Sequence, residues 1–244
     1  MEKTVDFGAK RVAPAEKTRR VGGVFDAVVD RYDAMNDIMS LGTHRLFKRV
    51  AVEMARLRPG QVILDLAGGT GDMTALTAPL LGERGRVVLV DVNTAMLRKG
   101  RDRLLDEGVP NFTPVQARAE SLPFPDACFD AVIVAFGVRN FTDKETGLRE
   151  MHRVLRPGGM AVVLEFSRVQ NRTLAKAYDA FRATWPIIGT AVAGTAAPYR
   201  YLVESIDRHP DQGAFRSMMA DAGFAEVEVQ NLAAGAAAIH RGVK

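Results

Sequence analysis

The sequence predicts one α/β domain built on a mostly parallel sheet that is covered by helices on both faces. Short apolar runs alternate with segments whose apolar residues recur at helical spacing, which is the pattern of βαβ units. The first apolar run ends in a glycine-rich turn that leads directly into a helical segment. With 244 residues, of which 47% are hydrophobic and 25% charged, the chain is long enough to bury the core of such a domain.

The N-terminal part is expected to cap this domain. Residues 1–20 carry charges throughout, so we expect them to be loosely ordered and do not interpret them as a secretory signal, which needs an apolar centre. From Val24 to Met54 apolar residues recur at helical spacing, which predicts two helices around a turn at residues 40–43. The single domain is therefore predicted to span residues 21–244, with residues 21–57 as its helical cap.

The alternating region follows the cap. Strands are predicted at residues 62–66, 86–91, 112–117, 129–136 and 160–166, and helices at residues 73–81, 94–107 and 144–155. Residues 170–205 break this rhythm and are predicted to form a helical insertion on the substrate side. Asp211 is placed to cap a helix that ends at Ala222, and two strands at residues 225–232 and 236–241 are predicted to close the chain as a hairpin.

Composition excludes several classes of protein. The net charge is 33 − 29 = +4 and is scattered, so nucleic-acid binding is not indicated, although contact with an anionic membrane surface stays compatible with it. Cys128 is the only cysteine, which excludes an internal disulfide and a cysteine-cluster metal site and favours a cytoplasmic location. The longest uncharged stretch, residues 183–199, is interrupted by proline and glycine and is too short to span a bilayer.

The glycine-rich turn is the strongest indication of a ligand site. Gly69 and Gly71, in the segment Asp65–Asp72, let the backbone approach a nucleotide-like ligand because they have no Cβ. Asp91 closes the next predicted strand, where its carboxylate is placed to accept the two ribose hydroxyls of an adenosine. The alternative is a purely structural turn followed by an unrelated acid.

Two features favour S-adenosylmethionine over NAD at this turn. The dinucleotide fingerprint G-x-G-x-x-G requires a third glycine where this chain has Thr74. Asp72 opens the following helix, where an acid would repel a pyrophosphate but suit a ligand that carries an ammonium and a sulfonium group. The loop Glu120–Asp126, which follows Arg118 and Ala119, is stiffened by prolines and is a candidate wall for the adenine ring. The alternative is that this loop is a surface turn whose Phe124 packs in the core.

Several segments resemble the ubiquinone/menaquinone-biosynthesis C-methyltransferases, and the resemblance covers nearly everything after residue 20. The segments are 24–26, 32–40, Asp65–Asp72, Leu122–Asp126, Phe136–Lys144, Arg153–Gly159, Tyr199–Ile206 and His209–Gln212. The glycine turn is shared by many methyltransferases, whereas Tyr-Asp-x-Met-Asn-Asp and Phe-Gly-x-Arg-Asn are far more specific. The sequence departs from the family pattern before Tyr199, where an acid is missing, and at Ala233–Gly235, so the choice of ring and tail is left open.

The resemblance implies the class I S-adenosylmethionine-dependent methyltransferase fold, which is Rossmann-like with a seven-stranded, mostly parallel sheet and an antiparallel C-terminal hairpin. It implies methylation of a ring carbon on a polyprenyl benzoquinol, a demethylmenaquinol, or both, without a metal. Family contacts to S-adenosylmethionine carry over to Thr70, Asp91, Arg118 and Ala119. Asp65, Gly69 and Gly71 of the glycine-rich segment are further candidate cofactor-binding residues. A further family contact, usually a serine, falls on Ala135, so a hydroxyl contact is missing there.

The catalytic centre is predicted at Arg139 and Asn140. A ring carbon becomes nucleophilic when a neighbouring hydroxyl loses its proton, so the site must hold a phenolate and provide a proton acceptor. Arg139 stays protonated and is expected to stabilise the phenolate, directly or through a water that takes the proton, unless it only pairs with a nearby carboxylate. Asn140 is expected to orient the ring hydroxyl. Tyr32 is placed either to reach one of the two ligands or to pack in the core. His44 is interpreted as a surface or capping residue rather than as a base.

The insertion and the partners leave further alternatives open. Its apolar side chains, among them Phe181 and Trp185, fit a groove for an isoprenoid tail, and equally a plain core or a dimer contact. A peripheral place at the inner face of the membrane, a homodimer and a quinone-biosynthesis complex are all compatible with the sequence. Rival functions are methylation of another lipid or aromatic compound, and a non-catalytic quinone-binding assembly component, against which the intact turn, Asp91 and Arg139 argue.

Overall fold

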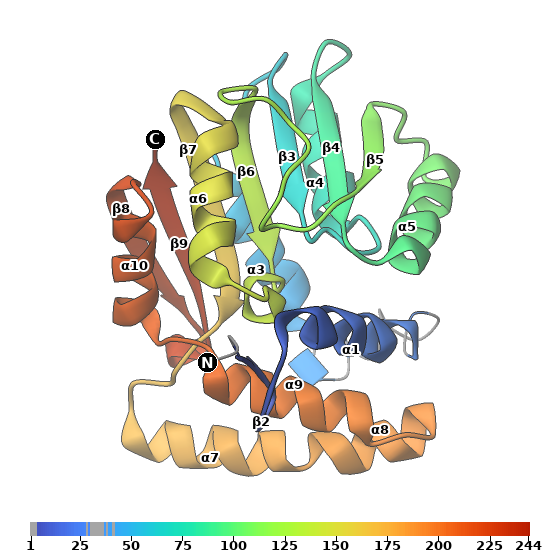
Figure 1. The fold of residues 1–244 in the computed structure, drawn as a ribbon, viewed down its shortest axis with the longest axis vertical. Helices are drawn as coiled ribbons and strands as arrows, with labels where there is room; N and C mark the ends of the chain where they lie inside the picture. The colour runs from blue at the N-terminus through green and yellow to red at the C-terminus, as the bar shows by residue number, and fades with distance from the viewer. Residues whose placement is uncertain (1–3, 28, 30–36, 38, 41) are drawn as a thin grey trace.

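A computed structural model of the chain describes residues 4–27, 29, 37, 39–40 and 42–244. Its centre is a seven-stranded sheet with the order β5-β4-β3-β6-β7-β9-β8 (Figure 1). The strands are β3 (Val62–Leu66), β4 (Arg86–Asp91), β5 (Phe112–Gln116), β6 (Phe129–Ala135), β7 (Leu155–Phe166), β8 (Ala225–Leu232) and β9 (Ala237–Val243). The pairs among β3 to β7 are parallel, and β9 runs antiparallel to both of its neighbours, which confirms the predicted sheet and hairpin.

Helices cover both faces of the sheet because the strand residues alternate between them. On one face Leu64 and Leu66 pack with side chains of α6 (Lys144–Val154) and α10 (Gln212–Asp221). On the other face Ile63 packs with α3 (Thr43–Met54) and α4 (Asp72–Leu81), and α5 (Thr94–Asp106) packs on Leu89 of the neighbouring strand. The order of the strands therefore brings the carboxyl ends of β3, β4 and β6 to one edge of a two-faced core.

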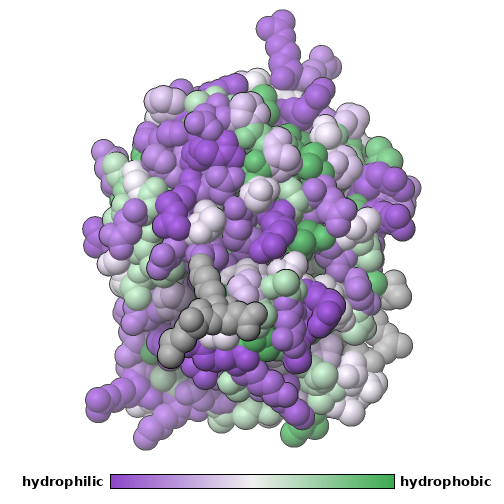
Figure 2. All heavy atoms as spheres, in the orientation of Figure 1, coloured by the Kyte–Doolittle hydropathy of each residue, from purple (hydrophilic) through white to green (hydrophobic). Residues whose placement is uncertain are grey.

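A third layer lies beyond that edge (Figure 1). It contains α1 (Pro14–Asp26), α7 (Arg172–Ala183), α8 (Trp185–Ala193) and α9 (Ala197–Arg208), so the insertion forms helices as predicted. A small apolar cluster anchors it, in which Trp185, Tyr199 and Ile206 are buried. Figure 2 shows a largely hydrophilic face with scattered hydrophobic residues, some of them at the lower edge, where this layer lies.

The expectation that residues 1–20 are loosely ordered is wrong for the described residues. Residues 5–7 (β1, Val5–Phe7) and 10–12 (β2, Lys10–Val12) form an antiparallel hairpin, and α1 begins at Pro14 instead of near residue 24. The reason lies far away in the sequence, on α9. The Phe7 ring stacks on Tyr201 with centroids 4.6 Å apart, and the backbone N–H of Ala9 donates to Glu204 Oε2 at 2.9 Å.

Candidate active site

The turn between β3 and α4 has the backbone geometry that its glycines predict. Gly69 and Gly71 have φ values of +57° and +84°, in the left-handed region that side chains disfavour. Gly71 precedes the first residue of α4, and a Cβ on it would lie 2.8 Å from Leu104 Cδ1 of α5. The turn is also tied to the neighbouring strand, because the N–H of Gly68 donates to the Val90 carbonyl at 3.0 Å.

Asp91 lies at the end of β4, beside this turn, as predicted. Its Oδ2 accepts the N–H of Gly69 at 2.9 Å, and its Oδ1 accepts the N–H of Asn93 at 2.8 Å. Burial raises the pKa of Asp91 above its ordinary value, while the backbone N–H groups act in the opposite direction. These backbone bonds fix the carboxylate at the carboxyl end of β4, where parallel sheets of this kind bind the ribose of a nucleotide-like ligand.

A first cavity, about 760 Å³ including its mouth, opens beside the turn and is within the size range of small-molecule sites. Five of the predicted cofactor residues line it: Gly69, Asp91, Arg118, Ala119 and Ala135. The three others lie behind its wall. Asp65 is buried and its Oδ2 accepts the N–H and the hydroxyl of Thr74, while Thr70 is buried and Gly71 caps the helix. These three residues hold the shape of the turn in place.

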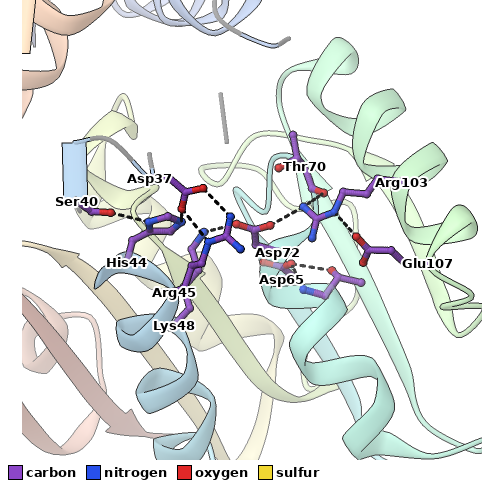
Figure 3. A network of polar contacts seen from close by, with 11 residues as sticks. Asp37, Ser40, His44, Arg45, Lys48, Asp65, Thr70, Asp72, Arg103 and Glu107 are labelled. Carbon is purple, nitrogen blue, oxygen red and sulfur yellow. Dashed lines mark hydrogen bonds and ion pairs between the residues drawn. The ribbon is translucent and has the colours of Figure 1, made fainter. Parts of the chain in front are cut away.

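The charge of Asp72 does not act as the sequence suggested. Its carboxylate binds Lys48 Nζ of α3 and Arg103 Nη1 of α5, each at 2.5 Å, and it is absent from the wall of the first cavity (Figure 3). Burial works against ionisation of this carboxyl, but the two cations outweigh it and lower the pKa of Asp72 to about 2. The argument that Asp72 faces a sulfonium is therefore wrong, because its charge is neutralised by helices that the local sequence does not reveal.

A second cavity, about 850 Å³, adjoins the first at the end of β6. The walls of both cavities contain Phe25, Ala135, Phe136 and Asn140. Phe136 has a φ of +57°, and Ala67 at the end of the adjacent β3 has a φ of +54°. Such backbone conformations in non-glycine residues store strain and gather at functional sites.

Arg139 lines the second cavity and is fixed there by an acid. Its Nη1 donates to Glu165 Oε1 at 2.8 Å, its backbone N–H donates to Glu165 Oε2 at 3.1 Å, and its guanidinium lies over the Phe166 ring at 5.2 Å from the centroid. The same Nη1 also bonds the Phe136 carbonyl. Nε is buried without a hydrogen-bond partner among the described residues. Arg139 thus pairs with a carboxylate, as one of the two sequence interpretations expected, and it also lines the second cavity.

Asn140 lies in the wall that the two cavities share. Its Oδ1 accepts a hydrogen bond from the Tyr201 hydroxyl at 3.1 Å, which orients the amide, and burial raises the pKa of Tyr201 to about 12. Tyr32, together with Asp33 and Asn36, lies outside the described residues. The N-terminal helix does reach the site through Phe25 of α1.

Several residues of the second cavity were not predicted from the sequence. Lys48 and Tyr201 line it, and Glu165 orients Arg139. The sequence does contain an indication of Glu165, because this residue is the only acid inside the apolar run Val162–Phe166. His44, expected at the surface or as a cap, is instead 7% exposed and lines this cavity.

The described part of the chain offers neither a cluster of metal ligands nor a helix that could cross a membrane. It contains no group of three or more histidine, cysteine, aspartate or glutamate side chains placed to hold a metal ion. None of the described helices combines the length and the apolar character that crossing a bilayer requires.

The sheet order, with a ligand cavity at the ends of its first two parallel strands, is that of the class I S-adenosylmethionine-dependent methyltransferases. A solved S-adenosylmethionine-dependent methyltransferase from Aquifex aeolicus superposes with a TM-score of 0.63 at 15% identity, over 86% of this chain and 97% of that one.

The sequence matches the ubiE/COQ5 methyltransferase family over residues 13–244, and the chain belongs to that family. It is 52% identical to the ubiquinone/menaquinone biosynthesis C-methyltransferase UbiE of Pseudomonas syringae pv. tomato, over 100% of this chain and 96% of that protein. The UbiE protein of Escherichia coli is 51% identical, over 100% of this chain and 98% of that protein. The predicted family and methyltransferase activity are thereby confirmed.

Proposed function

We propose that this chain transfers the methyl group of S-adenosylmethionine to a ring carbon of a polyprenyl benzoquinol, a demethylmenaquinol, or both. The observation that carries the proposal is the pair of cavities joined at the end of β6, one beside Asp91 and the other beside Arg139. A methyl transfer needs a donor and an acceptor site that meet along one line. The relatives named ubiquinone/menaquinone biosynthesis C-methyltransferases support the substrate class.

The first cavity suits the methyl donor, whose sulfonium supplies an electrophilic methyl group. The Asp91 carboxylate would accept hydrogen bonds from the ribose hydroxyls. Gly69, which has no side chain, would let the backbone approach the ligand closely. Arg118 and Ala119 lie in the same wall, where the sequence places the adenine ring. Ala135 contributes no hydroxyl, so we assign it a packing contact.

In the second cavity Arg139 and Asn140 would act on the quinol ring. The guanidinium group of an arginine is always positively charged in proteins. Glu165 holds the Arg139 guanidinium against the cavity wall. It would stabilise the negative charge that develops on the ring oxygen, in the manner of an oxyanion hole. Asn140, oriented by Tyr201, would position the ring hydroxyl. We retain Tyr32 as a further candidate contact.

The helical layer of α7 to α9 would receive the prenyl tail and face a membrane. Phe166 and Leu202 continue the apolar wall of the second cavity toward this layer. On its surface Leu174 and Ile187 are 51% and 72% exposed, which suits shallow contact with lipid at the inner face of the membrane. A homodimer or a larger quinone-biosynthesis complex would use the same apolar side chains.

Product analysis tests this function. The protein is given a polyprenyl benzoquinol and a demethylmenaquinol with an isotopically labelled methyl donor, and we expect a ring C-methyl product from at least one. Shortening the prenyl chain should raise KM. Labelled product from neither quinol, under conditions in which S-adenosylhomocysteine binds, would refute the proposed substrate class.

Arg139→Lys is the sharpest variant for the acceptor side, because lysine keeps a charge for Glu165 but loses the planar guanidinium. Loss of one preorganised donor to a developing oxyanion lowers kcat by about 10²–10³-fold, and S-adenosylhomocysteine affinity should stay unchanged. Arg241→Lys is the matched control, since Arg241 is buried on β9 and pairs with Glu228 at 3.4 Å, away from both cavities. Equal kcat values for the two variants would remove Arg139 from the mechanism.

A further inference from the structure

Ser40, His44 and Asp37 form a chain of polar side chains that runs from the second cavity toward solvent. Ser40 and His44 line the cavity, and Ser40 Oγ lies 2.7 Å from His44 Nδ1. On the other side of the ring, His44 Nε2 lies 3.8 Å from Asp37 Oδ1, and the Asp37 side chain is 36% exposed. Figure 3 shows the imidazole between the hydroxyl and the carboxylate.

The charges around His44 define its role. Burial lowers the pKa of His44 below its ordinary value, Lys48 and Arg45 act in the same direction, and Asp37 and Asp72 oppose them. The imidazole is therefore neutral at neutral pH and has one nitrogen lone pair to accept a proton.

The position of Asp37 favours one assignment of the imidazole proton. The hydrogen bond from Arg45 lowers the pKa of Asp37, against the smaller opposing effect of burial, so this carboxylate is ionised. An ionised carboxylate beside Nε2 favours the tautomer with its proton on Nε2, which leaves Nδ1 to accept from the Ser40 hydroxyl.

The other ionisable side chains in the described wall of this cavity are poor acceptors. They are lysine, arginine and tyrosine, and these residue types carry their protons at neutral pH. Arg139 is bound to Glu165, and Lys48 is bound to Asp72 at 2.5 Å. The described wall thus holds two cations that are already paired with acids, and one imidazole that can take up a proton.

We propose that Ser40 and His44 take the hydroxyl proton of the ring substrate and that Asp37 stabilises the resulting imidazolium at the solvent side. The inference rests on the proposed function and deepens it by assigning the proton acceptor. Ser40 would touch the substrate, and His44 and Asp37 would act through it.

The step balances in atoms and electrons. The substrate O–H bond breaks and its electron pair stays on oxygen, while the proton passes to Ser40 Oγ as the serine proton passes to His44 Nδ1. An electron pair of the ring then forms the C–CH3 bond, and the CH3–S bond breaks with its pair going to sulfur. The ring carbon later loses its hydrogen as a proton and the carbonyl oxygen regains one. One proton leaves in total, and it is the one carried by His44.

The test measures the pH dependence of single-turnover methyl transfer at saturating donor and quinol. The wild-type rate should fall on the acid side as His44 becomes protonated. His44→Gln should lower the rate by about 10²–10⁴-fold, which is the usual contribution of general base catalysis, and should lose that acid limb. His152→Gln is the matched control, because His152 is a partly buried histidine of α6 that packs on Phe224 and lines neither cavity.

Asp37→Asn keeps the test decisive if His44→Gln does not fold. It removes the negative charge that raises the pKa of His44, so the acid limb should move to lower pH. An acid limb that is unchanged in Asp37→Asn, or that persists in folded His44→Gln at the wild-type rate, would overturn the relay. The proposed function fails separately, when the wild-type protein makes no ring-methylated product at any pH.

Discussion

Replacing Glu165 by glutamine would break the buried ion pair that orients Arg139. Glu165 is 1% exposed and accepts three hydrogen bonds, from Arg139 Nη1 at 2.8 Å, from the Arg139 backbone at 3.1 Å and from the Phe166 backbone at 2.9 Å. Glutamine has the same size but only one oxygen, and its NH2 group would face the N–H donors of Arg139. The guanidinium would remain buried without a counter-charge.

The burial of the pair sets the expected magnitude. Only 7% of the Arg139 side chain and 1% of the Glu165 side chain are exposed, so solvent cannot replace the lost partner. Removing one member of a buried pair lowers the free energy of unfolding by about 3–5 kcal/mol, whereas an exposed pair contributes at most about 1 kcal/mol. For a domain of this size, 3–5 kcal/mol corresponds to a Tm lower by roughly 6–20 °C.

Urea unfolding monitored by tryptophan fluorescence measures this effect. Trp185 is the only tryptophan, is buried, and has its ring 6.3 Å from that of Phe166, the neighbour of Glu165. Glu228→Gln is the matched control, because its carboxylate is 59% exposed and pairs with Arg241 at 3.4 Å. A double variant, Arg139→Met with Glu165→Leu, removes both charges and should regain most of the lost stability. A Glu165→Gln midpoint equal to that of Glu228→Gln would refute the reasoning.

Three further predictions concern the donor side. Asp91→Asn removes the charge that would hold the ribose, so calorimetry should show a Kd for S-adenosylhomocysteine raised about 10- to 150-fold, the equivalent of one hydrogen bond to a charged group. Gly137→Ala places a Cβ 2.6 Å from the Ala67 Cβ, so its free energy of unfolding should fall by about 1–3 kcal/mol, whereas Gly23→Ala, with nothing within 4 Å, should be neutral or stabilising. Burial raises the pKa of Asp65 to about 6, so the folded state binds this proton more tightly than the unfolded state. The stability that this proton contributes is therefore lost as pH rises from about 4 to 6. In urea unfolding, the free energy of unfolding of Asp65→Asn should rise by about 3 kcal/mol relative to that of the wild type between pH 4 and pH 7. An affinity unchanged in Asp91→Asn, a Gly137→Ala stability equal to that of Gly23→Ala, or a parallel pH dependence would each contradict its prediction.

The sequence predicted those parts of the fold whose causes are local. The bounds of β3 and β4 follow from continuous apolar runs, because strands covered on both faces have few polar positions. The capping residue of α10 was predicted as well, since the Asp211 side chain accepts the N–H of Ala214, three residues later. Asp91 and Arg139 were placed at the site because the ends of parallel strands converge on one edge of a sheet.

The errors involve partners that are distant in the sequence. Asp72 appeared to be an unpaired acid at a helix start, and its cations come from residues 24 positions before it and 31 positions after it. The hairpin of residues 5–12 contacts α9, nearly 200 residues away, and Lys17 of α1 donates to the Phe141 carbonyl, 124 residues away. Polarity in a single sequence indicates exposure, and it cannot show that a charged or polar side chain has a buried partner on another element.

The placement of charge explains why the two cavities meet where they do. The four residues that both cavities share, Phe25, Ala135, Phe136 and Asn140, carry no charge, whereas Asp91 lies on the donor side and Arg139 on the acceptor side. Transfer from a sulfonium to a phenolate joins opposite charges and gives neutral products, so charge disperses as the new bond forms. Uncharged side chains at the junction do not compete with the attraction between the two reactants. A charged group in that wall would pair with one reactant before transfer and hold it away from the other. Of the two cavities, Asp91 therefore lines only the donor cavity, and Arg139 and His44 line only the acceptor cavity.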